Sequence, residues 1–288
     1  MTEVPFPEKL VSPPPGRIRR EDVVWKLWGD EASGRVSDEI WVANESIQQM
    51  LFTMAPGARF GHSEGHRTNL GADELYFVLS GTLVLANPET GEVHRVRTGE
   101  AVAFGRDTWH HGFSLGPEPL RVMEYFAPTP AMGASQAHAK GTPNLTAIRY
   151  GQEQFLGRWP AAADEAREKF SMRVLRDADV LWRLEGEPEP TLVGIYLSTD
   201  QLTAGVQELR PAQIGATHRH GGDEAGYVVS GTLHVHFTEY GGPGPGNGWY
   251  EIPTGEGFLV PKGTPHRYYN LGAEPARFLF GVAPSYLP

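Results

Sequence analysis

The chain contains the same pattern twice. DELYFVLSGTLVL at 73–85 matches DEAGYVVSGTLHV at 223–235 at an offset of 150 residues, and GEAVAFGRDTWHHGF at 99–113 matches GEGFLVPKGTPHRYY at 255–269 at an offset of 156. Two further matches lie outside these in the same order: REDVVWKLWG at 20–29 with RDADVLWRLEG at 176–186, and PLRVMEYFAPTP at 119–130 with PARFLFGVAPSY at 275–286. Four matches in one order predict two copies of a single module of about a hundred residues.

Each copy consists of short apolar stretches rich in Val, Phe, Tyr and Leu, separated by Gly, Pro, Asn and Asp. This pattern is typical of an all-β sandwich or barrel. We therefore expect an extended N-terminal arm at 1–19, one β domain at 20–128, a linker at 129–175 and a second β domain at 176–288. The linker should contain one short helix within PAAADEAREKF (160–170), where Pro comes first and acidic residues precede basic ones.

Composition removes several classes of function. A net charge of −10, with no dense run of Lys and Arg, argues against a nucleic-acid partner. The sequence has no Cys, so any metal must be held by His and carboxylate side chains. Neither a signal peptide nor an apolar run long enough to cross a bilayer is present, and we expect a cytoplasmic protein with no membrane partner.

Potential metal ligands gather at two places in the second copy. His218 and His220 share one face of an extended strand because they are two residues apart. The Gly-Gly-Asp sequence that follows lets Glu224 turn back to the same centre, and His266 follows a Pro-x-Gly turn some forty residues later. Three imidazoles and one carboxylate suit Fe(II), Mn(II), Zn(II), Ni(II) or Cu(II).

These residues resemble the two motifs of the cupin superfamily, and the chain as a whole resembles a bicupin, its two-domain form. The first motif reads Gly, five residues, His-x-His, three or four residues, Glu, six residues, Gly; HRHGGDEAGYVVSG at 218–231 fits it, although Ala212 replaces the leading Gly. The second motif, Gly-x5-Pro-x-Gly-x2-His-x3-Asn, fits GEGFLVPKGTPHRYYN at 255–270 throughout. The resemblance implies two tandem jelly-roll (double-stranded β-helix) barrels and a metal held by His218, His220, Glu224 and His266.

The first copy departs from these motifs. GHSEGHRTNLGADELYFVLSG keeps Glu74, but its histidines, His62 and His66, are four residues apart, and His110 holds the later ligand position. Residues i and i+4 of a strand still share a face. We therefore expect a second metal site formed by these four residues; a copy that has lost its metal is the alternative.

Aromatic residues near the motifs are candidates to line a substrate pocket, although alternate strand residues belong to the core by default. They are Tyr227, Phe258, Tyr268 and Tyr269 in the second copy, and Tyr76, Phe104 and Trp109 in the first.

The resemblance to bicupin dioxygenases implies an Fe(II)-dependent oxidoreductase that acts on a small aromatic or enol/dicarbonyl substrate, with dioxygen as a partner. Two alternatives stay open: a non-redox Mn or Zn enzyme such as a decarboxylase or isomerase, and a non-catalytic cupin that binds a small molecule. Related barrels associate, so we expect a homo-oligomer.

Overall fold

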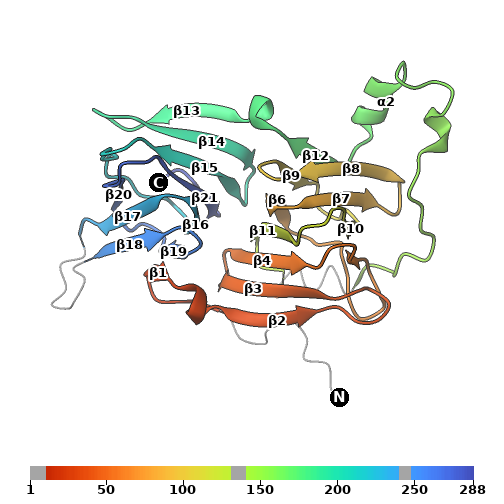
Figure 1. Ribbon diagram of the computed structural model, residues 1–288, viewed down its shortest axis with the longest axis horizontal. Coiled ribbons are helices and arrows are strands. Elements are labelled where there is room, and N and C mark those ends of the chain that lie inside the picture. The colour runs from red at the N-terminus through yellow and green to blue at the C-terminus, as the bar shows by residue number, and fades with distance from the viewer. Residues whose placement is uncertain (1–10, 131–140, 240–247) are drawn as a thin grey trace.

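The structure is a computed structural model that describes residues 11–130, 141–239 and 248–288. It contains two β modules side by side (Figure 1). Each module has one seven-stranded sheet and one smaller sheet, and every pair of neighbouring strands is antiparallel. The expectation of an all-β chain with two tandem modules is confirmed. The first ten residues of the predicted arm and residues 131–140 of the predicted linker lie outside the described residues.

The first module consists of two antiparallel sheets. In spatial order its large sheet contains β12 (Met172–Leu175), β9 (Ala101–Phe104), β6 (Asp73–Ser80), β11 (Leu120–Ala127), β4 (Gln48–Met54), β3 (Val36–Ala43) and β2 (Val24–Trp28). Its small sheet contains β5 (Arg59–Phe60), β10 (His111–Ser114), β7 (Thr82–Asn87) and β8 (Glu92–Arg97).

The second module repeats this order. Its large sheet contains β1 (Gly16–Ile18), β19 (Gly257–Val260), β16 (Asp223–Ser230), β21 (Ala276–Ala283), β15 (Thr203–Leu209), β14 (Thr191–Ser198) and β13 (Leu181–Glu185). Its small sheet contains β18 (Trp249–Pro253), β17 (Thr232–Phe237) and β20 (His266–Tyr269).

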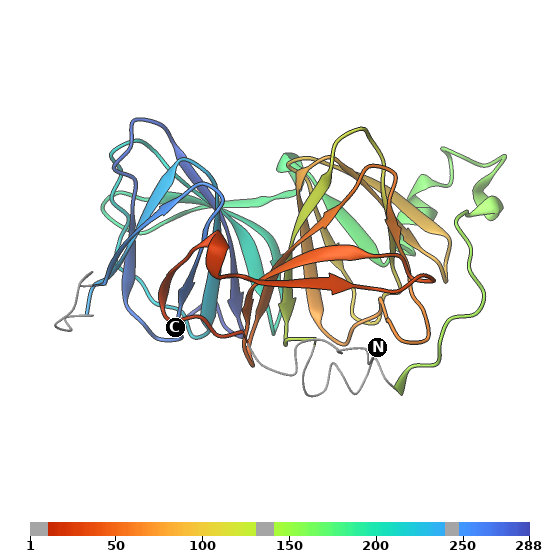
Figure 2. The ribbon, with the colours of Figure 1, turned by 60° about the horizontal axis from the view of Figure 1, so that its bottom comes forward.

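The two modules exchange one strand each. β1, at the end of the predicted arm, pairs with β19 of the second module, and Figures 1 and 2 show it in red against the blue strands. β12, at the end of the predicted linker, pairs with β9 of the first module. In the described part of the linker, α2 (Ala163–Glu168) lies within the stretch expected to be helical, and a 3-10 helix, η2 (Glu153–Phe155), precedes it.

Strand alternation divides the apolar residues into three large clusters. On β6, Tyr76 and Val78 point into the first module, whereas Leu75 and Phe77 point towards the second. The central cluster draws on both large sheets and includes Trp41, Tyr125 and Leu279, each at most 1% exposed. A third cluster fills the interior of the second module around Phe258 and Phe278. The modules are therefore joined by a buried apolar layer as well as by exchanged strands.

No helix among the described residues is long and apolar enough to cross a membrane.

Candidate metal centre

The four residues predicted as ligands in the second module lie together inside its barrel. His218 is joined to His266 by two backbone hydrogen bonds, each 2.9 Å long. Glu224 is on β16, and His266 is the first residue of β20. One ligand atom from each of His218, His220, Glu224 and His266 lies within 4.8 Å of the others. Within the described residues this is the one group of three or more His and acidic side chains with such spacing.

Backbone carbonyl groups fix the orientation of all three imidazoles. The Nδ1 atom of His218 lies 3.1 Å from the carbonyl oxygen of Ala216. Corresponding contacts join His220 to Tyr286 at 2.6 Å and His266 to Thr264 at 2.9 Å. A carbonyl oxygen can only accept, so each Nδ1 carries the hydrogen and each Nε2 is left with a lone pair. This is the tautomer that a metal-binding imidazole needs.

The lone pairs of these nitrogens face a carboxylate. Glu224 Oε2 lies 3.1 Å from His266 Nε2 and 3.5 Å from His220 Nε2. Oε2 is buried and has no hydrogen-bond partner. The imidazole nitrogens and Glu224 Oε2 are all hydrogen-bond acceptors, so they repel one another. A cation between them would remove this repulsion and offset the cost of burying the Glu224 carboxylate. The four side chains therefore fit a divalent transition metal, and their role as its ligands stays a prediction.

The protonation of the cluster also suits a cation. Burial, followed by the neighbouring His266, lowers the pKa of His218 to about 4, so this imidazole is neutral at pH 7. Burial alone would raise the pKa of Glu224. The adjacent imidazoles outweigh burial and lower that pKa to about 2, which keeps the carboxylate ionised.

A tight turn places the second half of the ligand set. Gly263 has a φ of +73°, a left-handed conformation that favours glycine, and its N–H donates to the carbonyl oxygen of His220 at 2.8 Å. This bond joins the His-x-His segment to the turn that leads into β20. The Pro-x-Gly part of the second motif thus positions His266 relative to His220.

The structure does not bring together the four residues expected to form a site in the first module. Only Glu74 and His110 are neighbours, with His110 Nε2 3.6 Å from Glu74 Oε1. His62 instead contacts His111 Nε2 at 2.6 Å and the carbonyl oxygen of Leu145 at 2.7 Å. His66 lies 3.2 Å from Asp30 Oδ2. The expected second site is therefore corrected: His62 and His66 are in a loop whose contacts direct them away from Glu74.

Other residues occupy the positions of the missing imidazoles. Asp107 N–H donates to the carbonyl oxygen of Leu70 at 3.0 Å, as Gly263 does to His220, and Asp107 has a φ of +66°. Leu70 is thus equivalent to His220, and Thr68, two residues earlier, to His218. The offset of 150 residues between the strands that follow would have shown this if it had been extended upstream. The first module has lost two of its four potential ligands.

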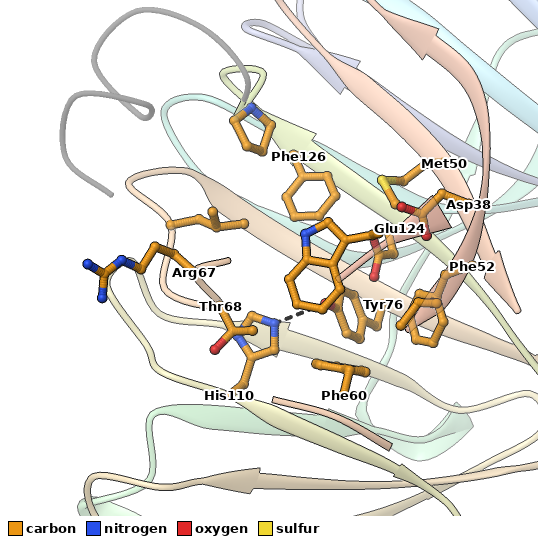
Figure 3. Close-up of a pocket in the computed structure, with 14 residues that line it drawn as sticks. Asp38, Met50, Phe52, Phe60, Arg67, Thr68, Tyr76, His110, Glu124 and Phe126 are labelled. Atoms are coloured by element: carbon orange, nitrogen blue, oxygen red, sulfur yellow. Dashed lines mark hydrogen bonds between the residues drawn. The ribbon is translucent and has the colours of Figure 1, made fainter. Parts of the chain in front are cut away.

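A cavity of about 70 Å³ lies in the first module beside these residues (Figure 3). Asp38, Glu124, Tyr76 and His110 contribute its buried polar groups, which the sequence analysis recognised only in part. Tyr76 O–H donates to His110 Nε2 at 3.0 Å, because His110 Nδ1–H is bonded to Thr108 O at 3.2 Å. Burial raises the pKa of Asp38 to about 8 despite the charge of Lys26, and raises the pKa of Glu124 well above its ordinary value.

The predicted pocket aromatics divide between three environments. Tyr76 lines the cavity of the first module, and Phe104 packs against His110 with ring centroids 4.7 Å apart. Phe258 and Tyr268 are inside the second module, and the Tyr268 hydroxyl lies 3.1 Å from His266 Nε2. The remaining three face elsewhere: Tyr227 packs on Trp41 between the modules, Trp109 on His62, and Tyr269 on Trp249. Tyr227 does not face a pocket because strand alternation on β16 directs it to the opposite face from Glu224 and Gly226.

Comparison with known proteins identifies the family. A model of the cupin domain matches residues 50–126 and 205–282, one match in each module. The chain therefore belongs to the cupin superfamily and is a bicupin. A search of curated protein sequences found no match.

Solved structures share the fold across nearly the whole chain. A putative glyoxylate-induced protein from Pseudomonas aeruginosa has a TM-score of 0.65 at 12% identity, covering 96% of this chain and 92% of the other. Protein Ylba from E. coli has a TM-score of 0.61 at 9% identity, with 96% and 94% covered. A formate complex of oxalate decarboxylase from Lactobacillus farciminis has a TM-score of 0.58 at 14% identity, with 95% and 86% covered.

Proposed function

We propose that this bicupin is a metal-dependent enzyme whose reaction takes place in the second module. The observation that carries the proposal is the convergence of one ligand atom from each of the three histidines and Glu224 within 4.8 Å, with every Nδ1 beside a backbone carbonyl oxygen. Four converging polar groups that serve only to fill the interior would cost stability, because the buried Glu224 Oε2 has no hydrogen-bond partner.

The reaction that we favour is Fe(II)-dependent oxidation of a small organic substrate by dioxygen. A divalent ion held by these four residues would supply both a Lewis acid and a binding place for dioxygen. The substrate class is an aromatic or enol/dicarbonyl compound, since two adjacent oxygens can chelate a metal.

The residues around the ligands orient such a substrate and exclude water. Phe258 and Phe278, both 0% exposed, supply apolar walls inside the second module. Burial holds the pKa of Tyr268 well above its ordinary value, so the hydroxyl keeps its proton and can donate a hydrogen bond to a substrate oxygen. Its position beside His266 Nε2 places this donor next to the ligand set.

A second candidate is a non-redox reaction at Mn(II) or Zn(II), such as decarboxylation of a small acid. It is favoured by the likeness in fold to oxalate decarboxylases, including the Lactobacillus farciminis protein in complex with formate. In this reaction the same four residues would hold the metal, which would act as a Lewis acid on the substrate carboxylate. If neither reaction is found, the remaining alternative is a non-catalytic cupin that binds a small molecule.

Metal analysis and oxygen uptake test the proposal. The purified protein, reconstituted with Fe(II) under anaerobic conditions, should bind about one metal per chain, and His266→Ala should lose most of it. His236→Ala is the matched control, because His236 is in the same module but packs against Trp249 away from the ligand set. Retention of metal by His266→Ala would overturn the site.

Oxygen uptake is then measured against phenolic, dicarbonyl and hydroxy-acid compounds. Uptake with one of them supports the dioxygenase. Release of carbon dioxide without oxygen uptake, after reconstitution with Mn(II), supports the non-redox candidate.

A further inference from the structure

Two acidic residues of the first module occupy positions that are apolar in the second. Asp38 on β3 is equivalent to Val193 on β14. Each strand has a β-bulge, which follows Ile40 in β3 and Ile195 in β14, and Asp38 and Val193 lie two residues before these isoleucines. Glu124 on β11 is equivalent to Phe280 on β21, since they pair with Tyr76 and Gly226 in matching registers. The first module has thus lost two imidazoles and gained two carboxyl groups in the same interior.

Both carboxyl groups are buried in the wall of the cavity. Asp38 is 2% exposed and Glu124 is 4% exposed, and both line the cavity. In the part of the chain that the structure describes, no Lys or Arg forms an ion pair with Glu124. Lys26, directly opposite on β2, acts on Asp38 electrostatically. Burial raises the pKa of both acids, and a cation between them would lower these pKa values and stabilise the ionised carboxylates.

Aromatic rings form most of the remaining wall. They are Trp28, Phe52, Phe60, Tyr76 and Phe126, joined by Met50 and Leu70. The faces of aromatic rings carry negative potential and attract cations, most strongly where water is excluded. Carboxyl groups beside several rings therefore recognise an ammonium group by two separate interactions.

The polar groups of the cavity are separated in space. Figure 3 shows Asp38 and Glu124 on one side and Arg67 on the other, with the Arg67 guanidinium directed away from the acids. Arg67 donates a hydrogen bond to Asn144, which holds it at this distance. The volume of about 70 Å³ is about half of the 150 Å³ that accommodates benzene. The inner part of the cavity thus suits a group of a few heavy atoms.

We infer that the cavity of the first module binds a small organic ammonium ion, with its charged head between Asp38 and Glu124. The aromatic rings surround the alkyl substituents, and any longer part of the ligand leaves past Arg67. The inference concerns a site outside the metal centre and does not depend on the proposed function.

Calorimetric titration of the full-length protein tests the inference with paired probes. Choline is compared with its neutral isostere 3,3-dimethylbutan-1-ol, and propylammonium with propan-1-ol. At least one cation should bind saturably and at least tenfold more tightly than its neutral partner. Equal binding of cation and alcohol in both pairs, or no binding of either cation, overturns the inference without any variant.

Variants then locate the binding. Glu124→Gln keeps the shape of the side chain and should weaken cation binding at least tenfold; Asp38→Asn provides a second test if the first fails to fold. Glu64→Gln, at an exposed acid of the same module, should change the affinity less than twofold. Unchanged affinity in folded Glu124→Gln and Asp38→Asn overturns the inference. His266→Ala should still bind the cation, so failure here and failure of the metal centre are distinguishable.

Discussion

At the scale of single residues, the two modules differ at the positions that decide what each interior can hold. His218 and His220 face Glu224 and His266 in the second module, whereas Thr68 and Leu70 stand at the equivalent places in the first. Glu74 and His110 are kept, 3.6 Å apart. Metal affinity falls steeply when two of four ligands are lost, so we expect one metal per chain.

Restoring the two imidazoles should create a second site. In the double variant Thr68→His and Leu70→His, the adjacent cavity gives the larger side chains room, and the metal content should rise from one to about two per chain. The measurement is elemental analysis after reconstitution and removal of loose metal. His62→Ala in the parent is the control and should not change the content, because His62 is bonded to Leu145 and His111. An unchanged ratio in a folded double variant would contradict the equivalence of the two interiors.

The sequence predicted the ligand cluster of the second module because its spacing fits a strand followed by two tight turns. The prediction of a ligand cluster failed in the first module because it followed the positions of the histidines alone. The backbone bond from Asp107 to Leu70 shows that register decides which residue faces inward, and register is not visible from residue types. Asp38 was missed for a related reason: an acid in SDEIWVA reads as a solvent-facing residue, and only the folded sheets show that both faces of β3 are buried.

At the scale of elements, the exchanged strands tie the modules together. β1 pairs with β19 through Gly16, Arg17 and Ile18, and Arg17 also forms two hydrogen bonds to the carboxylate of Glu256, one of them 3.0 Å long. β12 likewise pairs with β9 of the first module. The repeat in the sequence placed both strands just outside the matched segments. The sequence could therefore predict an extended arm but not the sheet that the arm joins.

Ile18→Ala tests the contribution of β1. Ile18 is 3% exposed and belongs to the central apolar cluster, so its truncation should lower the free energy of unfolding by about 2–5 kcal/mol. Urea denaturation followed by circular dichroism measures the loss. Ile148→Ala, at a side chain that is 53% exposed, should cost no more than about 0.5 kcal/mol. A similarly small loss for Ile18→Ala would mean that β1 separates from β19 before the sheet unfolds.

At the scale of the whole molecule, one buried layer links both modules. The central cluster takes Trp41 and Tyr125 from the first module and Leu279 and Tyr227 from the second, and Trp41 and Tyr227 are in ring contact at 5.3 Å. Interfaces of this apolar kind oppose independent motion and independent unfolding of domains. Burial of shared side chains and the exchange of strands act in the same direction. The modules should therefore unfold in one cooperative transition, although among the described residues only the second module has the full set of potential metal ligands.

This coupling predicts that a metal bound in the second module protects the first. A metal at a hundred times its dissociation constant stabilises the folded state by about 2.7 kcal/mol, and this should raise a single melting temperature by several degrees. Metal-loaded and chelator-treated protein are compared by circular dichroism, which reports on both modules. Hydrogen exchange at β4 and β6 measures whether the metal in the second module also protects the first module. His266→Ala is the control and should show no shift with metal. Two separate transitions, of which metal moves only one, would show that the central cluster does not couple the modules.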